Sequence, residues 1–445
     1  MGKYKDFDDD MSFDDKPDTE YDDTVFEDEE TDEEYARRRM EARRAMATRS
    51  TVRKRKKKSN KRWVVYLVIA LELILIVGLS LVWYIVKKID NVKEAPIKEQ
   101  EIVTNPDIKQ NTVEVLTGYT NILLLGTDAR EAIDGSQIQD KDGINHTDAM
   151  LVASINNDTK EVRIISVYRD CLMEMGEYDE TTGKVKDPVI DKATEAAFKY
   201  DITSAVSMIN RNLDLDIKDV VMVNWSALID MVDAVGGVDI PINLMEQRWL
   251  NRYLVDTSEN TGRQYTEITT FNDVGIEKLP DQQLSQNKEM MSNKIMTHMT
   301  GIQATAFARI RFGDGKADYG RTERQRAVIS QIVAKAKNMS NIKATAEALL
   351  ENVYVTSYIK QYALKNLTSI LNYRLTMIDG GFPFKRNDQL HEIDGFETKD
   401  PVIPVTLESN AKEFHRVLFD DDNYEPSDTI KNISEKIIRI TGVKN

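Results

Sequence analysis

The segment Trp63 to Val86, WVVYLVIALELILIVGLSLVWYIV, constrains this chain more than any other feature, because only Glu72 among its 24 residues is ionisable. As a helix it would be about 36 Å long, enough to cross the roughly 30 Å hydrocarbon core of a bilayer. It is too long for a signal-peptide core, and no small-residue cleavage site follows it. The sequence therefore predicts a single N-terminal transmembrane helix over residues 63–86.

Positive charge is concentrated on one side of this segment. The residues before it read RKRKKKSNKR, whereas Lys87 and Lys88 after it are followed by acidic residues. Segments rich in Lys and Arg stay in the cytoplasm. We therefore expect a single-pass cell-membrane protein with its N-terminus in the cytoplasm and residues 87–445 outside the cell. The single cysteine, Cys171, leaves no internal disulfide, which fits a surface protein of a Gram-positive-type bacterium.

The residues before the apolar run divide by charge. Residues 1–35 contain 17 acidic and 3 basic side chains, and residues 36–62 contain 14 basic and 1 acidic. The first range predicts a disordered acidic tail that could dock a cytoplasmic partner. The second predicts a basic juxtamembrane segment in contact with anionic lipid. Residues 87–118 are expected to form a linker on the other side of the membrane.

Strand and helix patterns alternate in the rest of the chain. The expected strands are 121–126, the hairpin 149–155 with 161–167, 238–242 and AFARIRF at 306–312; the expected helices are 192–211, 225–235 and 320–337. Such alternation predicts an α/β domain with a mixed sheet sandwiched by helices. We expect this catalytic domain to span residues 119–337. Residues 338–445 would form a C-terminal extension packed on or beside it.

Five arginines lie close together near residue 320: Arg309, Arg311, Arg321, Arg324 and Arg326. On the expected strand, Arg309 and Arg311 project from one face. On the expected helix, Arg321, Arg324 and Gln325 share one face. Guanidinium groups converging at a helix start suit a phosphate or pyrophosphate ligand.

Clustered arginines can also have two other kinds of partner. Nucleic acid is excluded here, because the domain is acidic and lies outside the cell. Local carboxylates such as Asp314, Asp318 and Glu323 remain an alternative, in which the arginines only form ion pairs.

Three short motifs place acidic and basic side chains at strand ends. GTDAR contains Asp128 and Arg130, HTDAM contains His146 and Asp148, and VYRDC contains Arg169 and Asp170. Because hairpin strands are antiparallel, Asp148 and Arg169 should be neighbours. Asp128 and Asp148 could hold Mg²⁺ together with phosphate oxygens, which is the usual way that this ion is bound.

The order of these motifs resembles the LytR-CpsA-Psr family of bacterial envelope proteins. The resemblance includes GTDAR, TDAM, YRD, VDAVGGVDI at 232–240, and GIQATAFARIRF with ADYGRTERQ at 301–325. It implies a phosphotransferase that needs Mg²⁺ and attaches an anionic glycopolymer, such as teichoic acid or capsule, to peptidoglycan in cell-wall assembly. The donor would be a polyprenyl-pyrophosphate carrier whose tail lies in an apolar cleft of an α/β fold.

The resemblance also implies roles for individual residues. The expected pyrophosphate binders are Arg130, His146, Arg169, Arg309, Arg311, Arg321 and Gln325. The expected metal ligands are Asp128 and Asp148, and the expected catalytic residues are Asp128, Arg169, Arg309, Arg311 and Asp318. Asp318 would orient arginines or assist proton transfer. This chain departs from the family pattern at His146, where an arginine is usual; an imidazole reaches less far and is largely neutral at pH 7.

Two other functions remain open at this stage. The same residues could hydrolyse a polyprenyl pyrophosphate with water as the acceptor, which would make the protein a pyrophosphatase. The chain could also be a non-catalytic regulator or sensor of the cell envelope that signals through its acidic tail.

Overall fold

The computed structural model describes two compact units, one within residues 1–77 and one within residues 78–445. The described residues are 32–52, 92–127, 147–179, 181–271, 280–312, 316–337, 353–365, 372–393 and 399–444, with residues 72, 80, 83, 86 and 87. Within these ranges, no helix combines the length and the apolar composition that a membrane crossing requires. Residues 1–31 of the predicted tail 1–35 and most of the predicted transmembrane segment 63–86 lie outside the described residues.

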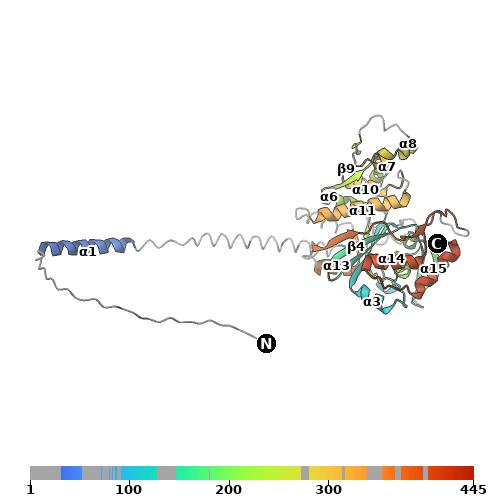
Figure 1. Ribbon diagram of the computed structural model, residues 1–445, viewed down its shortest axis with the longest axis horizontal. Coiled ribbons are helices and arrows are strands. Elements are labelled where there is room, and N and C mark those ends of the chain that lie inside the picture. Colours follow the sequence, from blue (N-terminus) through green and yellow to red (C-terminus); the bar gives the residue numbers. More distant parts are fainter. Residues whose placement is uncertain are drawn as a thin grey trace, which may run out of the picture. The chain divides into compact units, whose positions relative to one another are not determined.

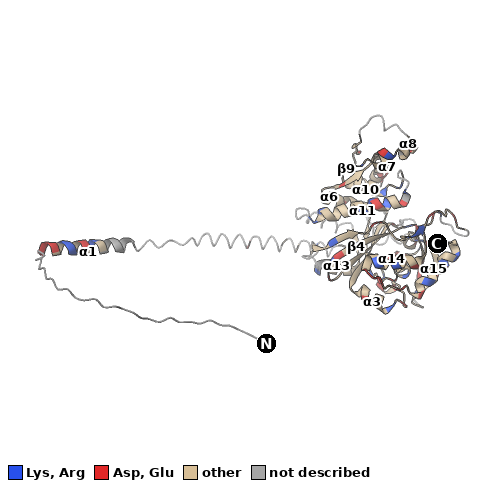
Figure 2. Cartoon of the chain, viewed as in Figure 1, with Lys and Arg blue, Asp and Glu red and all other residues tan. Residues whose placement is uncertain are grey.

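The first unit contains one described helix, α1 (Asp32–Val52), which crosses the boundary that the charge pattern places at residue 35. Asp32, Glu33 and Glu34 occupy its first turn, and arginines follow along its length (Figure 2). Acidic side chains at a helix start interact favourably with the helix dipole. Its side chains are exposed from Asp32 to Ala45, so within its own unit α1 packs no apolar face in that range.

The second unit is built on a seven-stranded sheet with the order β1-β10-β7-β2-β3-β4-β11. The strands are β1 (Lys93–Glu94), β10 (Val353–Val355), β7 (Asp219–Val223), β2 (Tyr119–Thr127), β3 (Thr147–Asn156), β4 (Glu161–Val167) and β11 (Arg374–Met377). Three neighbouring pairs are parallel and three are antiparallel, so the sheet is mixed, as the sequence predicts. The predicted hairpin is confirmed, because Met150 pairs with Val167 and Ile155 with Val162.

Both faces of the sheet are buried. Leu123 and Leu125 join one core cluster, whereas Ile122 and Leu124 lie in another cluster on the opposite face. Strands buried on both faces read as continuous apolar runs, which is why NILLLG shows no polar alternation. Figure 1 shows α14 and α15 on one side of the sheet and α10 and α11 on the other.

The first face is covered by elements from the beginning, the middle and the end of the folded unit. These are α3 (Gln110–Thr117), β5 (Leu172–Asp179), β6 (Lys184–Lys192), α4 (Glu195–Lys199), α5 (Ile202–Leu213), α14 (Leu407–Phe419) and α15 (Asp428–Thr441). The predicted C-terminal extension, residues 338–445, therefore supplies β10 and β11 to the sheet and helices α14 and α15 to the core.

The second face is covered by helices that carry the candidate site. Helices α11 (Ala317–Ala336) and α13 (Ser357–Lys365) pack on the sheet, and α6 (Trp225–Ala234), α7 (Leu244–Thr261) and α10 (Gly301–Arg309) form an adjoining core with β8 (Val238–Ile242) and β9 (Ile295–Met299). The remaining short elements are η1 (Glu99–Glu101), α8 (Asp281–Gln286), α9 (Lys288–Ser292), β12 (Arg386–Asn387) and β13 (Ile403–Pro404).

The strand predicted over 306–312 is wrong, because residues up to Arg309 form the end of α10. A capping box between Thr300 and Gln303 starts this helix. Gly301 then packs against α6 so closely that a Cβ atom would lie 2.2 Å from the backbone oxygen of Ile229. Residues 308–311 alternate between apolar and basic side chains, a pattern that also fits a strand. The capping box and the close packing of Gly301 on α6 favour a helix instead. Arg309 and Arg311 therefore do not share a strand face.

The linker predicted over 87–118 differs from the structure as well. Val92 and Ala95 are buried beside β1, and Leu116 of α3 lies in the main core cluster. The segment is polar overall, but several of its apolar residues pack against the core, among them Ile97, Ile102 and Val115, whereas Val113 is exposed. The range thus contributes to the folded unit in its described part.

Candidate functional site

Charged side chains from four chain segments meet at the end of the sheet where β3 begins and β4 ends. Asp148 is the second residue of β3, and Arg169 lies in the turn that follows β4. Asp318 and Arg321 lie near the start of α11, and Arg311 lies in the connection before that helix. We call these five residues the arginine–aspartate cluster. The hairpin and the start of α11 bring it together.

Asp148 is the centre of the cluster. Its Oδ1 atom lies 2.7 Å from Arg169, 3.4 Å from Arg311 and 3.3 Å from Arg321. The neighbourhood of Asp148 and Arg169 that the hairpin predicts is therefore confirmed. Oδ1 of Asp318 lies 2.5 Å from Arg321, 3.6 Å from Arg311 and 3.9 Å from Arg169. Three guanidinium groups thus share these two carboxylates, and Arg169 also lies 3.5 Å from Oδ2 of Asp170.

This sharing leaves hydrogen-bond donors of Arg169 and Arg321 unsatisfied among the described residues. The Arg321 side chain is only 3% exposed, and its Nε atom has no hydrogen-bond acceptor among the described residues. Burial lowers the pKa of Arg321 below its usual value, although Asp318 and Asp148 partly offset this effect. Buried donors are normally satisfied, so this arrangement is suited to an anionic ligand that brings further oxygens.

A second carboxylate pair adjoins the cluster. Asp170 lies close enough to Asp318 for each carboxyl group to affect the pKa of the other. Burial raises the pKa of Asp318, and the charge of Asp170 adds to this effect against the opposing effect of Arg321. Burial acts in the same direction on Asp170, but Lys192 and Arg169 outweigh it and lower its pKa. Asp318 is therefore the stronger base of the pair.

Arg309 is held apart from Asp148 by helices α6 and α7. Its guanidinium lies 3.6 Å from the ring centre of Trp225 and 5.4 Å from that of Tyr253. One nitrogen donates to Thr257 at 2.6 Å and another pairs with Asp256 at 2.5 Å. Arg309 is thus held by stacking on Trp225 and by the carboxylate of Asp256. Arg311 instead contacts the carboxylates of Asp148 and Asp318.

A polar cavity of about 430 Å³ joins these groups. Its lining residues are Asp148, Arg169, Trp225, Tyr253, Asp256, Asn260, Arg309, Arg311, Phe312 and Arg321. Arg309 and Arg311 therefore reach one cavity in spite of their different attachments. Phe312 is 56% exposed at its rim, so the cavity also offers aromatic surface.

An apolar cleft of about 260 Å³ adjoins the polar cavity, and Asp148, Trp225, Arg309 and Arg321 line both. It lies between the sheet and helices α6, α10 and α11. Its apolar lining is Leu124, Leu125, Leu151, Val221, Val223, Leu228, Met231, Val328, Ile329, Ile332 and Val333. One site thus combines an apolar cleft with a cationic mouth, which suits a ligand with a hydrocarbon tail and an anionic head.

The other residues predicted for the site divide into three groups. Asp128, Arg130 and His146 lie outside the described residues, as does Asp314. Gln325 lines the apolar cleft, one turn beyond Arg321. Glu323 pairs with Lys316 at 2.7 Å rather than with an arginine of the cluster.

Two of the five clustered arginines face away from the site. Arg324 is buried and lies 3.3 Å from Glu246 of α7, and it donates to the backbone oxygen of Ile310 at 3.1 Å. Arg326 is buried and donates to the backbone oxygen of Gly380. The shared face expected for Arg321, Arg324 and Gln325 is therefore wrong for Arg324, which joins α11 to α7.

Sequence reasoning missed the residues that α6 and α7 contribute, namely Trp225, Tyr253, Asp256, Thr257 and Asn260. Trp225 begins the expected helix 225–235, whereas the other four residues lie in the range 243–300, which is polar and shows no clear periodicity. A local pattern is present, because Asn243 and Glu246 form a capping box that starts α7. This helix start could have been found, but the direction of its side chains could not.

The ligands available for Mg²⁺ are few. Among the described residues, no group of three or more His, Cys, Asp or Glu side chains gathers in a way that could hold a metal ion. Asp148 nevertheless fits one position, because it lies at the mouth and its contacts with the arginines all use Oδ1. Mg²⁺ is often held by one or two carboxylates with substrate oxygens, so the donor set fits an ion that arrives with its substrate.

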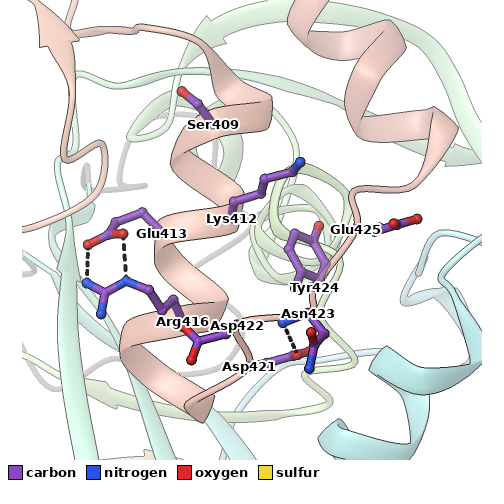
Figure 3. Close-up of a pocket in the computed structure, with 9 residues that line it drawn as sticks. All are labelled: Ser409, Lys412, Glu413, Arg416, Asp421, Asp422, Asn423, Tyr424 and Glu425. Carbon is purple, nitrogen blue, oxygen red and sulfur yellow. Dashed lines mark hydrogen bonds and ion pairs between the residues drawn. The ribbon is translucent and has the colours of Figure 1, made fainter.

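A further polar cavity of about 510 Å³ lies on helix α14 and the loop that joins it to α15 (Figure 3). Arg416 makes two contacts with the carboxylate of Glu413, at 2.5 and 2.9 Å. Lys412, Asp421 and Asp422 complete a mixed-charge lining. Because Arg416 already has its own carboxylate, this cavity shows no shared or excess charge of the kind found around Asp148.

Comparison with known proteins gives a family match over most of the folded unit. The sequence model of the LytR_cpsA_psr family matches residues 82–373. Polyisoprenyl-teichoic acid–peptidoglycan teichoic acid transferase TagU of Bacillus cereus (strain AH820) is 26% identical over 254 residues, which covers 57% of this chain and 63% of that protein. Biofilm regulatory protein A of Streptococcus mutans is 26% identical over 284 residues, covering 59% of this chain and 58% of that protein. The match thus spans less than two thirds of these relatives.

Solved structures of low sequence identity match a large part of the chain. Protein gbs0355 from Streptococcus agalactiae has a TM-score of 0.47 and 19% identity, and the match covers 72% of this chain and 93% of that one. TagT bound to LI-WTA has a TM-score of 0.43 and 18% identity, with 74% and 99% covered.

Proposed function

This chain belongs to the LytR_cpsA_psr family, and we propose that it is a membrane-anchored phosphotransferase that moves an anionic glycopolymer from a polyprenyl-pyrophosphate carrier to peptidoglycan. One observation carries the proposal: an apolar cleft opens directly onto the arginine–aspartate cluster. The hydrocarbon tail of the carrier fits the cleft, and its pyrophosphate fits the mouth. The transferase names of curated relatives support the same reaction class.

The arginines bind and orient the pyrophosphate. Arg169, Arg311 and Arg321 already converge within 3.4 Å of one oxygen of Asp148. Pyrophosphate oxygens can replace or bridge these contacts and accept from the free Nε donor of Arg321. Fixed guanidinium groups then stabilise the negative charge that develops during transfer. Arg309, stacked on Trp225, lines the part of the polar cavity that is formed by α6 and α7.

The proposed chemistry is a displacement at the phosphorus that carries the sugar chain. A hydroxyl oxygen of the acceptor forms a bond to this phosphorus, and the bond to the bridging oxygen breaks. Polyprenyl phosphate leaves with the bonding electrons. The hydroxyl proton passes to a carboxylate, and Asp318 is the proposed acceptor because burial raises its pKa and so makes it a stronger base.

Mg²⁺ is proposed as the cofactor. Asp148 would hold it, with Asp128 proposed as a second ligand from the segment after β2. When bound, the ion would supply further charge stabilisation to the phosphate oxygens. The arginines keep their binding and orienting roles in either case.

The decisive test of the function is a transfer assay with the full-length chain. The donor is a polyprenyl-pyrophosphate-linked glycopolymer, and the acceptor is a peptidoglycan oligomer or water alone. The proposal expects polymer joined to peptidoglycan and release of polyprenyl phosphate. Release that proceeds equally without peptidoglycan would make the protein a pyrophosphatase. A non-catalytic regulator would be favoured by two results together. The protein would turn over no donor, and the Arg321→Met variant would leave envelope signalling unchanged.

The membrane anchor is proposed over residues 63–86, with the N-terminus in the cytoplasm and the catalytic domain outside the cell. An anchored site stays beside a donor whose tail is dissolved in the bilayer. Protease added to protoplasts should degrade the chain beyond residue 90 and spare the acidic tail. Protection of the C-terminal part with loss of the tail would reverse the proposed orientation.

A further inference from the structure

A layer of aromatic and charged side chains adjoins the arginine–aspartate cluster. Tyr168 immediately precedes Arg169, and Tyr319 immediately follows Asp318. The two tyrosine rings meet edge to face, with their centres 4.7 Å apart. Two cluster residues from different elements are thus coupled through the rings of their chain neighbours.

The C-terminal segment completes this layer. The Arg386 guanidinium lies 4.0 Å from the ring centre of Tyr319 and 5.1 Å from that of Tyr168. The hydroxyl of Tyr319 donates to Oδ2 of Asp388 at 2.9 Å. Arg386 and Asp388 lie beyond the residues 82–373 that match the family, so the family motifs did not indicate them.

The segment that carries Arg386 is fixed against the end of β4. The backbone nitrogen of Phe382 donates to Ser166 at 2.8 Å, and that of Tyr168 donates to Phe382 at 2.9 Å. Gly381 fits so tightly that a Cβ atom would lie 2.9 Å from the Ser166 oxygen and 3.0 Å from the Tyr168 ring. Arg326 of α11 donates to Gly380 of the same segment. The segment therefore bridges β4 and α11, the two elements whose relative position sets the cluster.

We propose that Arg386 and Asp388 are positioning residues, which hold Arg169 and Asp318 in register for pyrophosphate through the rings of Tyr168 and Tyr319. The inference rests on the proposed function, because it assigns these residues a role in binding the same ligand. The physical reason is that each ring is one peptide unit from a cluster residue. A shift of either ring moves a backbone from which a guanidinium or carboxylate projects, and a small displacement at such a site has a large effect on binding.

The main test measures the affinity of the full-length chain for farnesyl pyrophosphate. Arg386→Met removes the cation over both rings and should weaken binding about three- to tenfold, since cation–π contacts are of that strength. Arg386→Lys should restore much of this loss, because it keeps the charge. Tyr319→Phe keeps the ring, loses only the hydroxyl bond to Asp388, and should have a smaller effect. Arg416→Met, a surface arginine of α14, is the matched control and should bind as wild type does.

A second measurement separates positioning from general stability. The Nε–H nuclear magnetic resonance signals of Arg169 and Arg321 are recorded in ligand-free protein. Arg386→Met should shift or broaden the Arg169 signal, and Arg416→Met should leave it in place. Unchanged affinity and an unchanged Arg169 signal in Arg386→Met, with only a lower melting temperature, would overturn the inference.

The two proposals can fail separately. If wild-type protein does not bind farnesyl pyrophosphate, the proposed function fails as a carrier-binding reaction. The Arg169 signal then still decides whether Arg386 positions the cluster. If wild type binds and Arg386→Met binds equally well with an undisturbed Arg169 signal, only the positioning role is lost.

Discussion

Asp148 and Asp214 are both surrounded by donors, but the donors differ in kind. Asp214 is fully buried, and its two oxygens accept four hydrogen bonds from neutral groups: Asn105 at 2.6 Å, Tyr424 at 2.7 Å, and the hydroxyl and backbone nitrogen of Ser427 at 2.7 and 2.8 Å. Asp148 is 24% exposed, and one of its oxygens lies near three guanidinium groups.

The difference separates a structural carboxylate from one at the candidate site. Asp214 connects Asn105, near the beginning of the folded unit, with Tyr424 and Ser427, near its end. Its hydrogen bonds therefore hold these two parts of the fold together. Around Asp148 the positive charge exceeds what one oxygen can satisfy, and a donor of Arg321 stays unused among the described residues. Saturation by neutral donors indicates structure, whereas shared and surplus charge beside a cavity indicates a place for a ligand.

The largest expected effect is on stability, in the Asp214→Ala variant. The tyrosine and serine donors would stay buried without an acceptor, and each such donor costs about 1–3 kcal/mol. We expect the free energy of unfolding to fall by at least about 4 kcal/mol. Urea unfolding of the full-length chain measures it.

The matched variant is Asp148→Ala. It should abolish Mg²⁺-stimulated transfer and leave the thermal midpoint much less changed than Asp214→Ala does. A greater loss of stability in Asp148→Ala than in Asp214→Ala would break the comparison, because Asp148 would then be the structural carboxylate.

Acid should weaken the Asp214 region through His415. Burial lowers the pKa of His415 to about 4, although its bond to the Leu213 backbone oxygen opposes this effect. The unfolded chain binds this proton near pH 6.5, so it takes up protons before the folded chain does. Stability is therefore full above about pH 6.5 and falls by about 3 kcal/mol as the pH decreases to about 4.

Unfolding measured across this pH window tests the assignment. His415→Gln keeps a donor for Leu213 and removes the titration, so its stability should depend less on pH. An equal pH dependence in wild type and His415→Gln would show that another group is responsible.

A smaller effect is expected on binding, in the Arg321→Met variant. This side chain contacts both carboxylates of the cluster and lines both cavities. Its loss should weaken binding of farnesyl pyrophosphate about a hundredfold, since bonds to charged groups are worth about 1.5–3 kcal/mol. Arg324→Met is the matched control on the same helix, because Arg324 is equally buried but contacts Glu246. We expect it to lose stability and keep affinity; the opposite pattern would contradict the site.

The smallest effect is expected for Arg309→Lys. Lysine keeps the charge but cannot reproduce the planar stack on Trp225 together with the contacts to Asp256 and Thr257. Binding of the same probe should weaken about three- to tenfold. A loss as large as that of Arg321→Met would mean that Arg309 binds the pyrophosphate directly and equally strongly. An unchanged affinity would limit Arg309 to joining α10 to α7.

Local sequence patterns predicted several parts of the fold and of the site. The hairpin 149–155 with 161–167 follows from two apolar runs around a polar turn, and its antiparallel pairing alone places Asp148 beside Arg169. The helix expected from residue 320 begins at Ala317 and ends near its expected boundary. These features depend on neighbours within a few residues, which a sequence displays directly.

Other parts depended on contacts between distant residues. The four-residue alternation around Arg309 suggested a strand, and only the packing of Gly301 on α6 makes it the end of a helix. Tyr253 of α7 reaches the cavity from a range without clear periodicity, and Trp225 reaches it from an expected helix whose orientation the sequence did not show. The layer around Arg386 joins residues that are more than 60 positions apart along the chain.

By itself, the sequence determined that arginines gather before and within one helix, that aspartates stand at two strand ends, and that the family is LytR_cpsA_psr. Only the tertiary structure decided which arginines reach the candidate site. Arg321, Arg324 and Arg326 lie on one helix, yet they contact Asp148, Glu246 and Gly380 respectively. Each residue of a helix is turned about 100° from the one before it, so Arg326 lies about 140° around the axis from Arg321 but Arg324 only about 60°. The difference between Arg321 and Arg324 therefore depends on which elements pack against α11. Which neighbour carries a ligand is fixed by the packing of α11 between the sheet, α7 and the C-terminal segment.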